Sequence, residues 1–390
     1  MNSLKNKTVN NIVFLLESPL TKRDKRRFGF DILTKKNFNV IYFDLTKISF
    51  SKWLKIVNIN SEMTGDHVYK FESISDVIEK IKQMKNLYFI SLISYNLKTK
   101  PLFYFLTKNN LKYAFFINSH VYSLNRNFFT RLRSMTLKKI KLGMSEYLNK
   151  IISFIFKDPA NMVVITGSKI SLDNIRIDKN TKKLWLHSWD YDKTLINIDS
   201  YVDISNEYIV FIDNNLPFHS DPIKVGVKPH EDPLKYYLEL CKFFQFVEEN
   251  TGYEVIIAAH PRANYETGKD YFRGRKVIQN KTDLLIKSSC LVITHLSASI
   301  SFAVIYNKPL LFITTDRLLK TKFAIEIPKF AEYFNKVPYN ISSDYNHIDL
   351  DNEMTIDEKR YKKYFRDYVK KKNSSNDISW QTIANYISKI

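Results

Sequence analysis

The hydrophobic and polar positions along the chain alternate between short apolar runs and longer stretches of helical period. In the first half, the apolar runs predict buried strands at 11–17, 38–45, 87–93, 112–118 and 162–166. Apolar residues at helical spacing predict helices between them, at 24–35, 74–84 and 128–156. Strands that alternate with helices in this way are typical of a parallel sheet covered on both faces.

The second half repeats the alternation. Apolar runs predict strands at 208–213, 253–259, 291–294 and 310–314, and helical periodicity predicts helices at 233–250, 282–288 and 297–306. Pro233 stands in the first turn of one helix and Gly252 just past its end, which is the usual asymmetry of helix ends. From about residue 355 the pattern is helical, and 377–390 has the spacing of a terminal amphipathic helix.

Two such units predict an α/β protein with two Rossmann-like domains facing a cleft and a helical C-terminus. We place the N-terminal domain at 1–190 and the second domain at 205–335. We interpret the polar stretch 167–206 as the link between them, with a candidate short strand at 184–186 and with Asp190 and Asp192 in a turn. The C-terminal helices at 350–390 form a third part that can pack back on the N-terminal domain.

The charge of the chain favours a polyanionic partner. Its 390 residues hold 60 Lys and Arg against 40 Asp and Glu, a formal charge of +20. The excess is concentrated in runs such as 131–141 and 359–372, and we expect it to dock the protein on an anionic membrane, a solvated basic surface being the alternative. Basic and aromatic residues interleave at 359–372, which would also suit single-stranded nucleic acid. No helix-turn-helix, zinc-finger or RRM pattern is present, so no nucleic-acid partner is expected.

Several protein classes are disfavoured by what the sequence lacks. There are 8 glycines and neither a G-x-G-x-x-G nor a P-loop pattern, which argues against a dinucleotide oxidoreductase and a P-loop NTPase. The 2 cysteines and the missing Cys–His spacings argue against a zinc module, and we expect no metal site and no cofactor. No secretory signal and no apolar run long enough to cross a bilayer are evident, so we expect a cytoplasmic protein.

Candidate chemistry follows the predicted strands of the second half, because ligands of open α/β sheets bind beyond the carboxyl ends of the strands. Asp213 ends one strand and Asp221 follows it; either carboxylate could act as general base, the alternative being an Asn/Asp-rich turn. The strand 253–259 runs into His260, Pro261 and Arg262. An imidazole and a guanidinium at this position can bind phosphate oxygens.

The strand 291–294 leads through His295 to Ser297 and Ser299, where the next helix begins. A helix N-terminus with several hydroxyl groups favours phosphate binding over simple capping, which needs one serine. Lys281 lies one connection earlier and is a further donor-binding candidate. In the first half, Glu17 and His120 follow strands and are the candidates for binding an acceptor.

These motifs resemble a known group of enzymes. A strand ending in His260–Pro261, followed by a strand and a serine-rich helix start, is similar to the HP and serine motifs of bacterial sialyltransferases and polysialyltransferases. In those families the two motifs hold the CMP part of CMP-sialic acid. Capsule Kdo transferases and CDP-glycerol glycerophosphotransferases share the arrangement, and all have GT-B-type folds. Here the serine motif is Ser-Ala-Ser, from Ser297 to Ser299. The acidic triplet that carries the base in sialyltransferases is missing, and Asp213 or Asp221 is our substitute.

The resemblance implies a metal-independent glycosyltransferase of surface polysaccharide synthesis. It would move a CMP-activated acidic sugar, such as sialic acid or Kdo, from its nucleotide to a capsule or lipopolysaccharide glycan. We expect it at the inner face of the bacterial cytoplasmic membrane, as a peripheral protein. One alternative is a CDP-alditol phosphotransferase or a UDP- or GDP-sugar transferase of the same fold. Another is a basic nucleic-acid-binding or scaffold protein.

Overall fold

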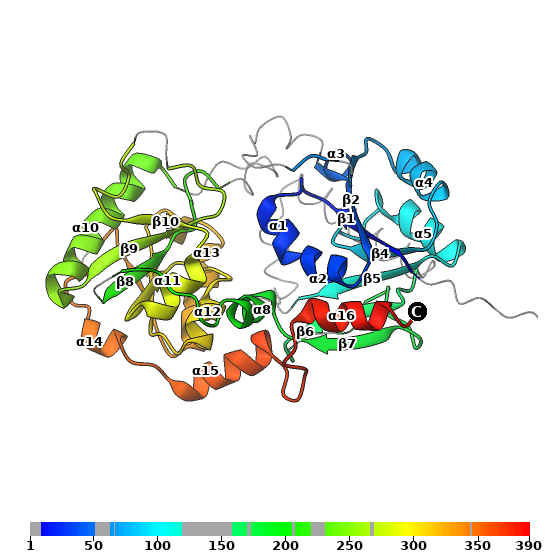
Figure 1. Ribbon diagram of the computed structural model, residues 1–390. Coiled ribbons are helices and arrows are strands. Elements are labelled where there is room, and N and C mark those ends of the chain that lie inside the picture. Colours follow the sequence, from blue (N-terminus) through cyan, green and yellow to red (C-terminus); the bar gives the residue numbers. More distant parts are fainter. Residues whose placement is uncertain are drawn as a thin grey trace, which may run out of the picture. The chain divides into compact units, whose positions relative to one another are not determined.

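The computed structural model describes residues 9–50, 63–65, 67–118, 158–169, 172, 174–204, 207–219, 231–265, 269–343 and 345–390. These residues form two compact units, each built on one parallel sheet (Figure 1). Unit 1 contains the described residues up to 187 together with 373–390, and unit 2 contains those of 188–372. Two Rossmann-like units and a helical C-terminus are therefore confirmed.

The sheet of unit 1 has seven parallel strands in the order β3-β2-β1-β4-β5-β6-β7. Its strands are β1 (Asn11–Leu16), β2 (Asn39–Asp44), β3 (Val68–Lys70), β4 (Leu87–Ser91), β5 (Lys112–Ile117), β6 (Met162–Thr166) and β7 (Lys182–Leu186). Its helices are α1 (Lys22–Arg27), α2 (Phe30–Lys35), α3 (Thr46–Phe50), α4 (Ile74–Lys82), α5 (Lys100–Lys108) and α16 (Ser379–Ile387).

The sheet of unit 2 has six parallel strands in the order β10-β9-β8-β11-β12-β13. Its strands are β8 (Tyr208–Ile212), β9 (Glu254–Ala259), β10 (Val277–Gln279), β11 (Leu291–Thr294), β12 (Leu310–Thr314) and β13 (Pro338–Asn340). Its helical segments are α8 (Trp189–Ile196), α10 (Pro233–Thr251), α11 (Thr282–Ser288), α12 (Ile300–Ile305), η1 (Leu318–Lys320), α13 (Phe323–Tyr333), α14 (Leu350–Glu353), α15 (Glu358–Tyr364) and η2 (Phe365–Val369).

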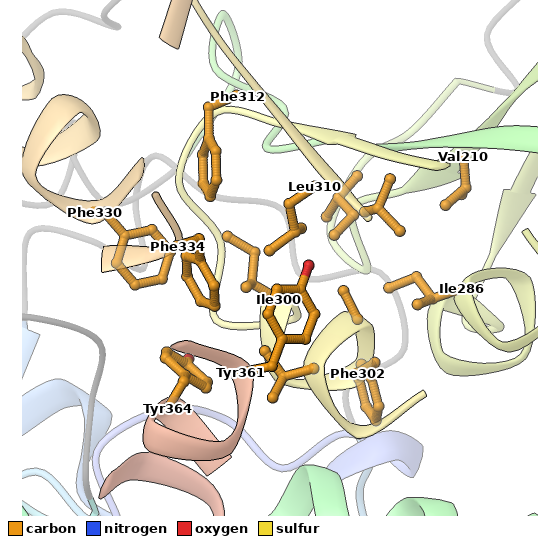
Figure 2. Packing of buried hydrophobic residues seen from close by; sticks show 14 of the residues in the cluster. Val210, Ile286, Ile300, Phe302, Leu310, Phe312, Phe330, Phe334, Tyr361 and Tyr364 are labelled. Carbon is orange, nitrogen blue, oxygen red and sulfur yellow. The ribbon is translucent and has the colours of Figure 1, made fainter. Parts of the chain in front are cut away.

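Side chains of unit 2 fill two buried clusters, one on each face of the sheet. Successive residues of a strand point to opposite faces, so β8 sends Val210 into one cluster and Phe211 into the other. Figure 2 shows the first cluster, where Tyr361 lies near Ile300 and Leu310. Both faces are covered, and this explains why the strands of the sheet read as continuous apolar runs.

The C-terminal helix α16 packs within unit 1. The indole Nε1 of Trp380 donates a hydrogen bond of 2.8 Å to the carbonyl of Arg27, and its ring lies 5.5 Å from that of Phe14. Gly29, between α1 and α2, has a φ of 65° and faces the same indole. The left-handed backbone at Gly29 splits the helix that we predicted at 24–35 into two.

Two further predictions were wrong in detail. The stretch 167–206, predicted to be a link with a short strand at 184–186, contains the longer strand β7 and the helix α8, which was not predicted. The hydroxyl of Ser188 caps α8 by accepting from the backbone N–H of Tyr191 at 3.3 Å, so Asp190 and Asp192 lie in a helical first turn. The helix predicted at 128–156 lies outside the described residues. Among the helices that are described, none is long and apolar enough to cross a membrane.

Candidate functional site

The candidate site of unit 2 lies where its parallel strands end. All carboxyl ends of a parallel sheet are on one edge, and β8 lies between β9 and β11 in this sheet. Asp213 therefore has the end of β9, with His260, on one side and the end of β11, with Ser297, on the other. Neighbouring strands are about 4.8 Å apart, so the ends of β9 and β11 are separated by about 10 Å. A single ligand must extend across the end of β8 to touch both.

Asp213 connects the loops at this edge. It is 3% exposed, and its Oδ1 accepts from the backbone N–H of Asn215 at 2.7 Å. Its Oδ2 accepts from the backbone N–H of His260 at 3.1 Å and from the hydroxyl of Tyr265 at 2.8 Å. Burial raises the pKa of Asp213, and these three donors lower it in part. Both oxygens bind the protein, so Asp213 holds the His260 loop in place, and its role as general base stays a prediction.

Two hydrogen bonds fix the backbone of His260. Its N–H binds Asp213, and its carbonyl accepts from the side-chain amide of Gln279 at 3.1 Å. The ring Nδ1 accepts from the backbone N–H of Arg262 at 3.2 Å, which places the hydrogen of the neutral imidazole on Nε2. The ring of His219 lies 5.1 Å from that of His260, edge to face. The turn therefore fixes the tautomer of the His260 ring and places exposed Pro261 and Arg262 beside it.

Lys281 is also at this edge. It is exposed, it occupies the N-cap position of α11, and it follows the carboxyl end of β10 by two residues. The side-chain amide of Gln279, the last residue of β10, donates to the carbonyls of both His260 and Ala263. The lysine thus follows, by two residues, the glutamine that binds the His260 turn, and its role in donor binding stays a prediction.

His295 has a different role from the one we predicted. It is 2% exposed; its Nε2 lies 2.9 Å from the hydroxyl of Tyr236, and its Nδ1 lies 2.9 Å from the carbonyl of Ile313. Burial lowers its pKa from 6.5 to about 4, so the ring is neutral near pH 7. With both nitrogens bound inside the protein, His295 has none left for a donor phosphate. The prediction that it binds the donor is corrected: it is a core residue.

The serines stand on a loop rather than in the first turn of a helix, since α12 begins at Ile300. The hydroxyl of Ser297 accepts from the backbone N–H of Ser299 at 3.2 Å, and both residues are partly exposed. The side-chain amide of Asn214 donates to the carbonyl of Leu296 at 3.1 Å. The loop that carries Ser297 and Ser299 is therefore tied to the end of β8, on the opposite side from His260.

Two residues of this edge gave no clear signal in the sequence. Tyr265 binds Asp213, and its hydroxyl lies 3.0 Å from that of Tyr237. Glu231 is buried and accepts from the hydroxyl of Thr315, just after β12, and burial raises its pKa. Glu231 directly precedes the N-cap of α10, and only the fold brings it to the end of β12.

Of the two residues predicted to bind an acceptor, the structure describes Glu17. Glu17 follows β1, and its carboxylate accepts from the backbone N–H of Ser94 at 2.8 Å and from the Ser94 hydroxyl at 3.2 Å. This contact joins the carboxyl ends of β1 and β4. The other acceptor candidate, His120, and the candidate base Asp221 lie outside the described residues. In the part of the chain that is described, no group of three or more His, Cys, Asp or Glu side chains is arranged to hold a metal ion.

Comparison with known proteins finds solved structures of similar fold. No protein-family model matches the chain, and no curated protein matches its sequence. A variant of the wall teichoic acid polymerase TagF is 14% identical, with 98% of this chain and 90% of that chain covered at a TM-score of 0.57. TagF itself gives 13%, the same coverage and 0.52. The glycosyltransferase of kitacinnamycin is 8% identical, with 97% and 98% covered at 0.50. At these identities the matches show the fold alone, two Rossmann-like units of the GT-B kind.

Proposed function

We propose that the protein is a glycosyltransferase that binds a nucleotide-activated sugar at the carboxyl edge of the unit 2 sheet. The observation that carries the proposal is the turn of His260, Pro261 and Arg262, held by Asp213 and Gln279 beside the Ser297 loop. The turn carries an imidazole and a guanidinium directly after β9, at the place where an open parallel sheet binds its ligand. The fold, shared with a polymerase and a glycosyltransferase, supports the same reading.

In the proposed reaction an acceptor hydroxyl oxygen attacks the anomeric carbon of the donor sugar. The bond from that carbon to the phosphate oxygen breaks, and the phosphate leaves with the electron pair. His260 and Arg262 stabilise the negative charge on the phosphate, with Lys281, Ser297 and Ser299 as further donors. Asp221 is the proposed base that takes the hydroxyl proton. The acceptor is a surface glycan bound through unit 1, where Glu17 and His120 are the proposed contacts.

The proposed donor is a CMP-linked acidic sugar such as sialic acid or Kdo, because the His-Pro and Ser-Ala-Ser motifs are similar to those that hold CMP in sialyltransferases. A CDP-activated alditol is the second candidate. It is favoured by the fold likeness to TagF, one variant of which was soaked with CDPG. Both donors present a cytidine nucleotide, so binding of CMP and CDP tests them together.

Titration calorimetry with CMP, CDP, UDP and GDP tests the proposal. We expect cytidine nucleotides to bind at micromolar concentrations, and His260→Ala to weaken binding about tenfold or more by removing one hydrogen bond to a charged phosphate. His67→Ala, at an exposed histidine just before β3 in unit 1, is the matched control and should leave binding unchanged. Equal binding by wild type and His260→Ala would refute the site. Absence of nucleotide binding together with tight, salt-sensitive RNA binding would refute the proposal that the protein is a glycosyltransferase.

A further inference from the structure

The basic segment that the donor site does not use forms the helix α15 and the π-helical segment η2 of unit 2. Its aromatic residues point inward: Tyr361, Tyr364 and Tyr368 are all buried in the first core cluster. Figure 2 shows Tyr361 and Tyr364 among the side chains of that cluster. The rings of Tyr361 and Tyr364 lie 5.5 Å and 5.1 Å from that of Phe334. These tyrosines have no ring surface left for stacking on a nucleic-acid base, which removes the main argument for single-stranded nucleic acid.

The cations of the segment point outward, as helical periodicity requires when the tyrosines point inward. They line an open hollow of about 1050 Å³, together with Asn335, Asp357 and Glu358. We call these five cations the basic face: Lys359, Arg360, Lys362, Lys363 and Arg366. Lys362 pairs with Glu358 at 2.7 Å on the exposed surface, and Arg366 pairs with the buried Asp367 at 2.9 Å. Positive charge remains in excess on this surface.

The basic face lies away from the candidate donor site. The hydroxyl of Tyr361 donates to the carbonyl of Lys308 at 2.7 Å, and Lys308 precedes the start of β12. Asn335 precedes the start of β13 in the same way. Lys308 and Asn335 therefore lie at the amino ends of their strands, whereas His260 and Ser297 lie beyond the carboxyl ends. A ligand of the basic face would therefore bind at the amino ends of the strands, and a nucleotide at the donor site would bind at their carboxyl ends.

We propose that the basic face docks unit 2 on a bilayer that contains anionic phospholipid. Charge complementarity supports this partner, because a row of long cations, four of the five exposed, matches the negative surface of such a bilayer. The hollow gives lipid phosphate groups room to enter between the side chains. With its tyrosines inward, α15 offers charge but little apolar area, so binding should be electrostatic, reversible and weakened by salt.

Sedimentation of the full-length protein with lipid vesicles tests the docking surface. The probes are vesicles of phosphatidylglycerol mixed with phosphatidylcholine, and vesicles of phosphatidylcholine alone. A triple variant, Lys359→Gln, Lys362→Gln and Lys363→Gln, removes three exposed charges and leaves the buried tyrosines in place. Each charge near an anionic surface is worth about fivefold in affinity, so we expect about a hundredfold loss on phosphatidylglycerol vesicles.

A matched triple variant removes the same charge elsewhere: Lys82→Gln, Lys85→Gln and Lys108→Gln, all at exposed positions in unit 1. Retained binding by this control, with loss in the basic-face variant, supports the proposal. Equal loss in both variants would mean that only net charge matters and would overturn it. So would equal binding to both vesicle types, absence of binding to either, or a preference for RNA. Because cytidine nucleotide binding is measured separately, failure of the docking surface leaves the proposed reaction intact.

Discussion

At the residue scale, the buried ring of His295 makes the stability of unit 2 depend on pH. Its pKa is lowered from 6.5 to about 4 because the ring is buried between Tyr236 and Ile313. Between these two pH values the unfolded chain binds a proton at this residue and the folded chain does not. The free energy of unfolding must therefore fall as the pH falls through this window, by up to about 3 kcal/mol, and be unaffected by this residue above it.

Denaturant unfolding from pH 7.5 to pH 4 in wild type and His295→Gln measures this contribution. We expect the variant to be less stable at neutral pH, because it loses ring contacts, and to lose less stability on acidification. Asp213 and Glu231 have raised pKa values and act in the opposite direction, but they are present in both proteins. If the stabilities of the two proteins changed in parallel with pH, the pKa of His295 would be the same in the folded and the unfolded chain, which would contradict the prediction.

The sequence predicted the location of these polar residues better than their roles. Asp213, His260 and Ser297 all follow strands, and strand ends can be read from apolar runs. It could not show that the backbone N–H of His260 and the hydroxyl of Tyr265 both turn toward Asp213. It also could not distinguish a core histidine from a ligand-binding one, because burial of His295 is created by residues distant in the chain.

At the element scale, the central strands were predictable and the edges were not. Strands β6, β11 and β12 have the bounds that their apolar runs predict, since a strand buried on both faces leaves a continuous apolar signature. Three of the four edge strands, β3, β10 and β13, are three residues each, too short to leave such a pattern. The fourth, β7, has five residues, but two lysines begin it and only its apolar end, 184–186, was predicted as a short strand. Prediction of α12 from Ser297 placed its start three residues early, because serines are common both at helix caps and in the loops before them.

The α1–α2 junction gives a prediction about stability. Gly29 has a φ of 65°, and a Cβ added there would lie 2.2 Å from Cγ of Trp380. Gly252, which ends α10, has a φ of 74° with nothing within 4 Å of an added Cβ. Gly252→Ala should therefore cost only the left-handed backbone strain, about 1 kcal/mol. Gly29→Ala should cost clearly more, because strain and a steric clash with the indole add.

Denaturant unfolding of both alanine variants measures the difference. The excess cost of Gly29→Ala should shrink in part when Trp380→Ala is combined with it, since that change removes the indole Cγ and Cδ1 and leaves only the Cβ of residue 380 near the new Cβ. If the two glycine variants lose equal stability, or if Trp380→Ala brings no relief, α16 does not pack against the junction as described.

At the scale of the whole molecule, the two units do not follow the order of the chain. We predicted the C-terminal helices at 350–390 as one part. The structure divides them: α14 and α15 belong to unit 2, whereas residues 373–390, with α16, belong to unit 1. The sequence shows amphipathic helices there, but the partner of each apolar face is set by tertiary packing. The chain therefore passes from one unit to the other after His187 and again after Lys372.

This arrangement makes truncation of the C-terminus a test that separates the units. A chain ending at Lys372 loses the buried side chains of α16, among them Trp380, Ile383 and Ile387. Burial of each such side chain contributes about 2 kcal/mol, so their joint loss approaches the whole stability of an ordinary domain. We expect unit 1 to unfold or open widely, although the deleted residues directly follow unit 2 in the sequence.

Hydrogen exchange read by mass spectrometry can assign the effect to strands. Amides of β1 and β2 should exchange much faster in the truncated chain, because α16 and the Trp380 indole cover α2 and Phe14 beside them. Amides of β8 and β11 should keep their protection, since both cores of unit 2 are complete without residues 373–390. A chain ending at Ser388, just past α16, is the control and should exchange like the full chain. Faster exchange in β8 and β11 instead would mean that α16 stabilises unit 2 rather than unit 1, and residues 373–390 would then belong with the second sheet.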